Sequence, residues 1–163
     1  KLGKATSAPR KKARRNRKPA RDETVSYLVR VTGWDYYFGF HLNRAKNKWE
    51  DGPYTEIATL TFNGELVEPQ ASKYRHVSVT LNGKAELMDE RRGGTPPLSL
   101  GSLSAGGDEL SAYIFIPAAR LSELVTVAQS GRVQTIHLGG TTLHYRSGLI
   151  YSFSLDTKWE EEP

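Results

Sequence analysis

The chain has 163 residues with a formal net charge of +5, and it contains no cysteine. The length predicts one domain, and the missing cysteine excludes disulfide bonds, thiolate metal sites and cysteine nucleophiles. No apolar run reaches the roughly 18 residues that a membrane-spanning helix needs, and the first residues hold no apolar signal-peptide segment. We therefore expect an intracellular protein, cytoplasmic or associated with the nucleoid or nucleus, and no membrane partner.

Charge is distributed unevenly along the chain. Of the 23 cations, ten lie in residues 1–21 together with no acid, which leaves 13 cations and all 18 acids, a net charge of −5, in the remainder. Residues 1–22 also lack a periodic apolar pattern, so they predict a flexible basic arm, disordered in isolation, in front of a single β-rich domain over 23–163. The arm cations expected to contact phosphates are Arg10, Lys11, Lys12, Arg14, Arg15, Arg17, Lys18 and Arg21.

The arm has a known physical mode of binding. Lys and Arg side chains neutralise phosphates and release condensed counterions, which gives affinity without sequence preference, and Arg adds a bidentate fork for phosphate. We therefore expect nucleic acid, DNA or RNA, as the partner of the arm, and a protein partner or self-association through the acidic body. The same composition also fits a solubilising tail, a localisation signal or a grip on an acidic protein surface.

Alternating apolar residues predict two strands at the start of the domain. The first covers residues 25–31, and Gly33 behind it indicates a turn or a bulge. The second covers residues 36–42.

The second strand is rich in aromatic residues. Tyr36, Phe38 and Phe40 share one face, which we expect to lie in the core. Tyr37 and His41 point to the opposite face and are candidates for a surface that contacts a ligand.

A polar loop with the sequence NRAKNKWEDGP follows the aromatic strand. Arg44, Lys46 and Lys48 lie close together in it beside Trp49. We expect a second set of phosphate contacts here, with Trp49 as a ring on which a base can stack. A plain solvated turn is the alternative.

A third strand is expected over residues 54–62. It ends at Asn63-Gly64, and the same pair returns at Asn82-Gly83. Because a two-residue type I′ turn needs positive φ at both positions, each pair predicts a hairpin turn. The residues of the strand before the second turn that we expect to face the core are Val77, Val79 and Leu81.

Residues 91–109 are rich in Gly, Pro and Ser and show no apolar period. Long stretches of this kind are usually functional loops or disordered segments. We expect a mobile loop that folding does not require.

The last third of the chain predicts a strand over 110–116, one helix and three short strands. Pro117 suits the first turn of the helix and Gly131 its end. The short strands are expected to be broken at Gly139-Gly140 and at Ser147-Gly148. The apolar stripe of the helix is formed by Leu121, Leu124, Val125 and Ala128.

This order of elements indicates an α+β protein with a mainly antiparallel sheet. We expect a β-sandwich or an open barrel with one packed helix.

Signals for catalysis or metal binding are weak. If Gly139-Gly140 is a tight turn, His137 and His144 share a face as diagonal neighbours, but no carboxylate follows nearby as a third metal ligand, so a solvated polar face is favoured. We expect no cofactor and no metal. The acids that a metal-dependent nuclease would have to bring together are Glu56, Glu65, Glu86 and Asp89, and their spacing fits no known template.

The sequence therefore favours a non-catalytic binding subunit of a nucleoprotein assembly that contacts phosphates through its arm. The alternative is a structural subunit, such as a shell or scaffold protein with a basic arm. A metal-dependent nuclease is the third interpretation.

Overall fold

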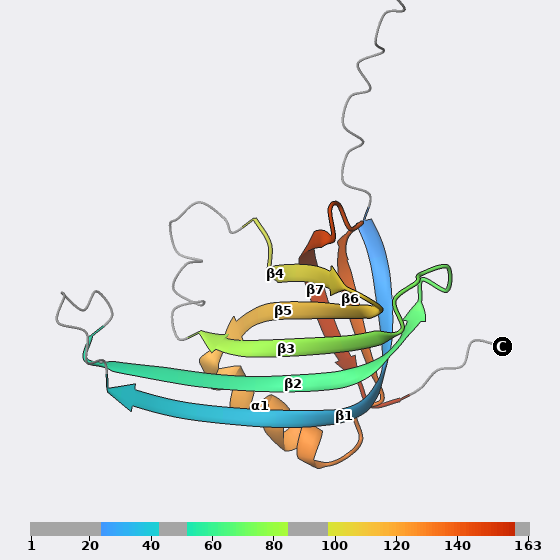
Figure 1. The fold of residues 1–163 in the computed structure, drawn as a ribbon. Coiled ribbons are helices and arrows are strands. Elements are labelled where there is room, and N and C mark those ends of the chain that lie inside the picture. Colours follow the sequence, from blue (N-terminus) through green and yellow to red (C-terminus); the bar gives the residue numbers. More distant parts are fainter. Residues whose placement is uncertain (1–23, 43–51, 85–97, 159–163) are drawn as a thin grey trace, which may run out of the picture.

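The computed structural model describes residues 24–42, 52–84 and 98–158. These residues form mostly β-structure with one helix, so the expected α+β class is confirmed (Figure 1). The elements are β1 (Thr24–Leu42), β2 (Tyr54–Glu68), β3 (His76–Lys84), β4 (Gly101–Gly106), β5 (Glu109–Pro117), α1 (Ala118–Gln129), β6 (Thr135–Thr141) and β7 (Ser147–Asp156).

The strands form a closed barrel in the order β1-β2-β3-β5-β4-β7-β6. The barrel closes because β6 pairs antiparallel with the first part of β1, from Thr24 opposite Thr141 to Arg30 opposite Thr135. Of the strand pairs in the described ranges, β3–β5 is parallel and the others are antiparallel. The sheet is therefore closed rather than open.

The prediction of a hairpin turn at Asn63-Gly64 is wrong. Both residues lie inside β2, opposite Gly33 and Val31 of β1, where the register shifts and confirms the expected bulge. β1 consequently runs through this point as one strand instead of two. Gly64 is needed for a close approach of two chains, because a Cβ there would collide with the carbonyl oxygen of Arg30.

The expected turn at Asn82-Gly83 is also wrong, because both residues lie inside β3. A Cβ on Gly83 would lie 3.2 Å from the Cα of Ala118 and 3.3 Å from Cδ2 of Leu121, both in α1. The glycine thus lets the helix pack closely on the strand. Neither Asn-Gly pair has positive φ, in contrast to Gly107 (φ 61°), which follows β4 in the β4–β5 turn.

The expected mobile loop over residues 91–109 is corrected in its second half. Residues 91–97 lie outside the described residues, but Gly101–Gly106 form β4 between β5 and β7. Leu103 on this strand is only 1% exposed, whereas Leu98 before it is 88% exposed. Gly and Ser are tolerated in β4 because every second residue faces solvent and Gly101 lies against the main chain of β5.

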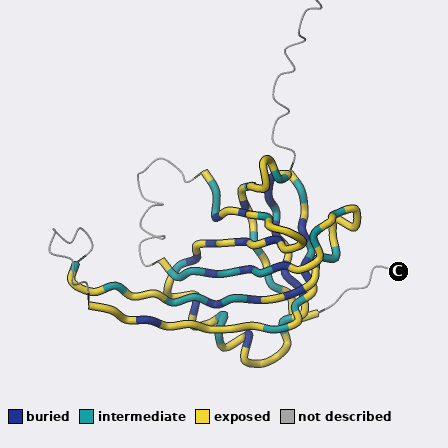
Figure 2. The backbone as a smooth tube through the Cα atoms, in the orientation of Figure 1, coloured by how far each residue is buried: buried dark blue, intermediate teal, exposed yellow. Residues whose placement is uncertain are grey.

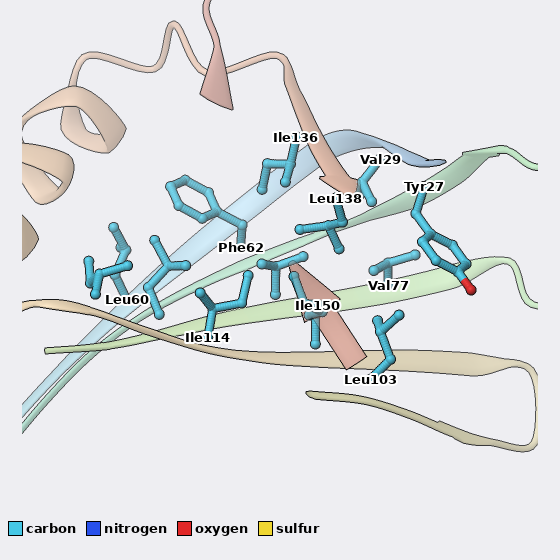
Figure 3. Packing of buried hydrophobic residues seen from close by; sticks show 14 of the residues in the cluster. Tyr27, Val29, Leu60, Phe62, Val77, Leu103, Ile114, Ile136, Leu138 and Ile150 are labelled. Atoms are coloured by element: carbon cyan, nitrogen blue, oxygen red, sulfur yellow. The ribbon is translucent and has the colours of Figure 1, made fainter. Parts of the chain in front are cut away.

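The core fills the barrel and extends under α1 (Figure 3). The inward positions expected on β3 are confirmed. The fully buried large side chains are Phe62, Leu60, Leu81, Leu103, Leu110, Ile114, Ile136, Leu138, Ile150, Val29 and Val79.

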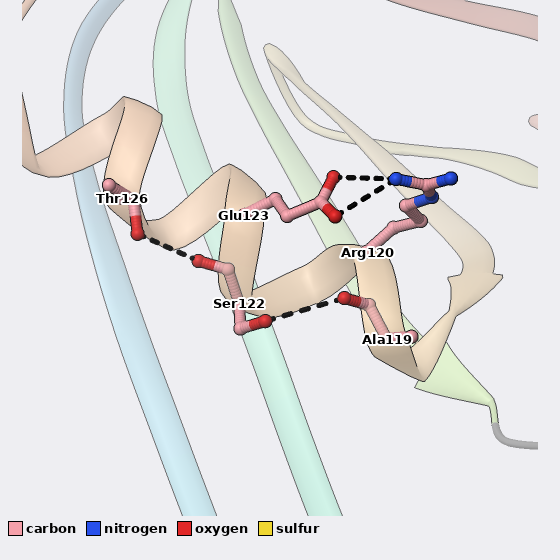
Figure 4. Close-up of polar contacts among 5 residues, drawn as sticks. All are labelled: Ala119, Arg120, Ser122, Glu123 and Thr126. Atoms are coloured by element: carbon pink, nitrogen blue, oxygen red, sulfur yellow. Dashed lines mark hydrogen bonds and ion pairs between the residues drawn. The ribbon is translucent and has the colours of Figure 1, made fainter.

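The helix α1 packs against β3, β2 and β5. Its expected stripe is confirmed, with Leu121 and Ala128 buried and the two residues between them half-buried. Pro117 is its N-cap residue, and Gly131, with φ 66°, lies just after its end. Polar side chains occupy the other face, where Arg120 and Glu123 form an ion pair of 2.9 Å (Figure 4).

Two strands follow the helix instead of the expected three. Gly139-Gly140 lies inside β6, and the chain reverses further on, at Tyr145 and Arg146, which have positive φ. His137 and His144 are therefore not neighbours across a tight turn. The ring of His144 contacts that of Tyr145, whereas Nε2 of His137 lies 3.4 Å from Oδ2 of Asp156.

Candidate nucleic-acid interface

The antiparallel pair β1–β2 extends past the other described strands. β3 pairs with β2 only as far as Thr59, and β6 pairs with β1 only as far as Arg30. Residues 36–42 of β1 and 54–60 of β2 therefore form a protruding hairpin stem, which we call the ribbon (Figure 1). Most of it is exposed (Figure 2).

The expected core position of the aromatic residues on the ribbon is wrong. Tyr36, Phe38 and Phe40 are 46%, 54% and 59% exposed. They do lie on the side of the sheet that faces the core, since Tyr36 is opposite the buried Leu60. The strand, however, continues beyond the barrel, so the inner face of β1 stays exposed from Tyr36 to Leu42 although Leu60 opposite Tyr36 is buried. Phe40 stacks on Tyr54 of β2, with ring centroids 5.2 Å apart.

The outer face of the ribbon carries Tyr37 and His41, as expected, and both are exposed. The two side chains converge above Gly39. A Cβ on this glycine would lie 2.7 Å from Oη of Tyr37 and 2.8 Å from Nε2 of His41. The buried state of Gly39 is thus due to two neighbours on its own strand.

Sheet register joins Tyr37 to polar and aromatic residues on three further strands. Tyr37 is opposite Thr59, Thr59 is opposite Asn82, and Asn82 is opposite Phe115. Tyr113 lies two residues before Phe115 on β5 and faces the same way. Neighbouring strands lie about 4.8 Å apart, so this row crosses the outside of the barrel over about 14 Å.

The side chains at the β3–β5 end of this row contact one another. Nδ2 of Asn82 donates a hydrogen bond of 2.6 Å to Oη of Tyr113. The rings of Tyr113 and Phe115 meet edge to face with centroids 5.3 Å apart, and Nζ of Lys84 lies 5.9 Å from the centroid of Phe115. Tyr113 and Phe115 are 39% and 42% exposed. We call this set, Tyr37, Asn82, Lys84, Tyr113 and Phe115, the outer aromatic face.

The chemistry of this set suits a nucleotide. Exposed ring faces on a sheet stack unpaired bases. The amide of Asn82 offers both a donor and an acceptor, and the ammonium group of Lys84 offers a charge for a phosphate.

Of the residues that the sequence marks as candidates for binding, Tyr37 is in this set, and none of the expected phosphate-binding residues is. The arm cations from Arg10 to Arg21, and Arg44, Lys46, Lys48 and Trp49, all lie outside the described residues, so these expectations stay predictions. In the sequence, the loop with Trp49 joins the two ends of the ribbon.

Tyr113 and Phe115 were not predicted as site residues, because the strand expected over 110–116, LSAYIFI, is apolar at most positions. Its even positions, Leu110, Ala112 and Ile114, are buried, whereas the two aromatic residues at odd positions face outward. Period-two alternation within this strand was the signal that could have identified them.

The described ranges hold no cluster of three or more His, Cys, Asp or Glu residues that could bind a metal. Glu56 and Glu65 lie far apart on the same strand, β2, and Glu86 and Asp89 lie outside the described residues. In the described part of the chain, no helix is long and apolar enough to cross a membrane.

One tyrosine in the core has a perturbed acidity. Burial, and to a smaller extent the nearby Tyr74, raises the pKa of Tyr27, whose hydroxyl donates a hydrogen bond of 2.9 Å to the carbonyl oxygen of Thr141. This group joins β1 to the end of β6 and lies inside the barrel, so its role is structural.

Comparison with models of known protein families, with curated proteins and with solved structures returns no match. The inference of function therefore depends on the residues and geometry of this chain.

Proposed function

We propose that the protein is a non-catalytic subunit of a nucleoprotein assembly that binds single-stranded nucleic acid, with bases on the outer aromatic face and phosphates on the basic arm. The observation that carries this proposal is the contact between Tyr113, Phe115, Asn82 and Lys84 on the outside of the barrel. Exposed rings combined with an amide and a cation provide stacking, a hydrogen bond and charge at one place.

The basic arm supplies the positive charge that the rest of the chain lacks. With residues 1–21 removed, the remaining chain has a net charge of −5, which repels a polyanion. Ten arm cations without an acid reverse this balance. The arm therefore provides affinity for phosphates without sequence preference, and the outer face provides a preference for unpaired bases.

A titration of fluorescently labelled single-stranded DNA and RNA, followed by anisotropy at several salt concentrations, tests both parts. If about five arm cations bind phosphates, log K falls with log salt with a slope of roughly −3 to −4 on single strands. Deleting residues 1–21 should bring this slope close to zero.

Phe115→Ala tests the outer face. Stacking is worth about 1–3 kcal/mol per base, so affinity should fall about 5- to 150-fold while the salt slope is kept. The matched control is Tyr145→Ala, which removes a ring that is 91% exposed in the β6–β7 turn and should leave affinity unchanged. Equal affinity of the two variants would exclude the outer face, and unchanged binding after arm deletion would exclude the arm.

A structural or scaffold subunit is the second candidate function, and the uncovered inner face of the ribbon favours it. Native mass spectrometry of the protein purified from its host distinguishes the two, because large closed assemblies support the structural subunit and nucleic-acid complexes of defined stoichiometry support the proposed function.

A further inference from the structure

The outer edge of β1 is unpaired in the described structure beyond its bulge. The last main-chain hydrogen bond on this side joins the amide of Val31 to the carbonyl oxygen of Gln134, at 2.8 Å. From Trp34 to Leu42 the strand pairs with β2 alone among the described strands. A long, apolar edge of this kind is a template for pairing with another strand.

The inner face next to this edge is also uncovered. The large side chains on it that are at least 36% exposed are Trp34, Tyr36, Phe38, Phe40, Leu42 and Tyr54. Each offers roughly 100 Å² at half exposure, or about 500–600 Å² for the set. Pairing of two β1 edges buries the parts of these side chains that lean toward the partner's strand, which is a fraction of the roughly 800 Å² that each partner contributes to a standard interface, and main-chain hydrogen bonds along the edge add to it. A two-stranded stem alone is only marginally stable in water, so a partner here would stabilise the ribbon itself.

We infer that the partner is a second copy of this chain, and that residues 34–42 of the two β1 strands pair antiparallel about a two-fold axis at Phe38. The sequence WDYYFGFHL is self-complementary about this residue. Phe38 faces the partner's Phe38, and on the same inner face Tyr36 is opposite the partner's Phe40. The interface is isologous, so the pair of Phe38 residues lies on the axis and occurs once, and each of the other pairs occurs twice.

Charge complementarity selects this register. On the outer face, Asp35 is opposite the partner's His41. The carboxylate and the imidazole form an ion pair when the ring is protonated and a hydrogen bond when the ring is neutral. Tyr37 is opposite the partner's Gly39, so no two bulky side chains meet on that face.

Other registers lose these pairs. A two-fold axis at Tyr37 would place Asp35 opposite the partner's Gly39, and an axis at Gly39 would place Tyr37 opposite the partner's His41. A two-fold axis midway between two residues would place inner-face residues of one strand opposite outer-face residues of the other, because side chains alternate with a period of two. An axis at any residue keeps the two faces matched, and the axis at Phe38 is the one that also places Asp35 opposite the partner's His41. This inference does not depend on nucleic-acid binding, because it uses the unpaired edge and residues 34–42 of β1, of which only Tyr37 belongs to the outer aromatic face.

Sedimentation velocity of the full chain, washed in high salt to remove nucleic acid, should show a dimer. Phe38→Asp places two carboxylates directly opposite each other at the axis and should give a monomer with unchanged circular dichroism. Tyr145→Asp, in the exposed β6–β7 turn, is the matched control and should stay dimeric. A monomeric wild-type chain at tens of micromolar would overturn the inference.

Cysteine cross-linking tests the register, since the chain has no cysteine of its own. Opposite Cβ atoms in an antiparallel pair lie about 4.5–5.5 Å apart, close to disulfide distance. Under mild oxidation, Phe38→Cys should form disulfide-linked dimers at least about tenfold faster than Phe40→Cys, and a mixture of Tyr36→Cys with Phe40→Cys should give the mixed dimer. Equal cross-linking rates of Phe38→Cys and Phe40→Cys would show that the axis is not at Phe38.

Discussion

Leu103→Ala should destabilise the protein strongly, although the residue lies in a stretch of Gly, Pro and Ser. The side chain is 1% exposed, and its Cδ1 would lie 3.4 Å from a Cβ on Gly140 of β6. The substitution removes three buried carbon groups, worth roughly 2.4 kcal/mol at about 0.8 kcal/mol each. The cavity left behind adds to this, so we expect a loss of about 3–4 kcal/mol in the free energy of unfolding.

Urea denaturation followed by circular dichroism measures this loss as a lower midpoint. A total stability of about 5–15 kcal/mol is usual for a domain, so the expected loss is at least about a fifth of it. Leu98→Ala is the matched control, because Leu98 is 88% exposed and its truncation should change stability by less than about 0.5 kcal/mol. If the two variants unfold at the same urea concentration, β4 is not part of the core and the barrel described above is wrong.

Phe38→Ala should cost less than about 1 kcal/mol in the monomer, whereas Phe62→Ala in the core should cost about 3–5 kcal/mol, and chemical denaturation compares them. Gly101→Ala should cost about 1–3 kcal/mol, because a Cβ would collide with a carbonyl oxygen of β5, while Gly106→Ala meets open space and should be close to neutral by thermal melting. The raised pKa of Tyr27 means that its neutral form is favoured in the fold. The stability from this group is therefore present below about pH 10, the unfolded pKa, and lost as pH rises through the folded pKa. Tyr27→Phe should reduce this alkaline loss in melts between about pH 9 and 12.

The parts of the fold that the sequence predicts well are those where one local pattern has one structural cause. The stripe of α1 needs only helical spacing, and the end of the helix needs only positive φ at Gly131. Inward positions such as Val79 follow from alternation on a strand with solvent on one side. No distant contact is needed to interpret any of these patterns.

The parts predicted wrongly depend on contacts between distant segments. Gly64 and Gly83 follow Asn as in a hairpin turn. The reason for each glycine is a distant contact, because a neighbouring strand at Gly64 and the helix at Gly83 leave no room for a side chain. Alternation shows which way Phe38 faces, but not whether any element reaches far enough to cover it. Apart from Tyr37, the candidate site was missed for the same reason, since Asn82 meets Tyr113 only through the parallel pairing of β3 with β5.

The pairing of β1 with β6, which closes the barrel and which we call its seam, forms only after most of the chain has been synthesised. Tyr27 and Thr141 are bonded across this seam although they are 114 positions apart in the chain. A ribosome therefore releases β1 and β2 long before β6 exists, and in this interval the hairpin can form while its seam edge is still open. Closure between such distant segments is slow compared with hairpin formation. The nascent chain thus exposes the whole edge of β1 that faces away from β2 until β6 has been translated, and in this interval a chaperone can protect the edge from pairing with other chains.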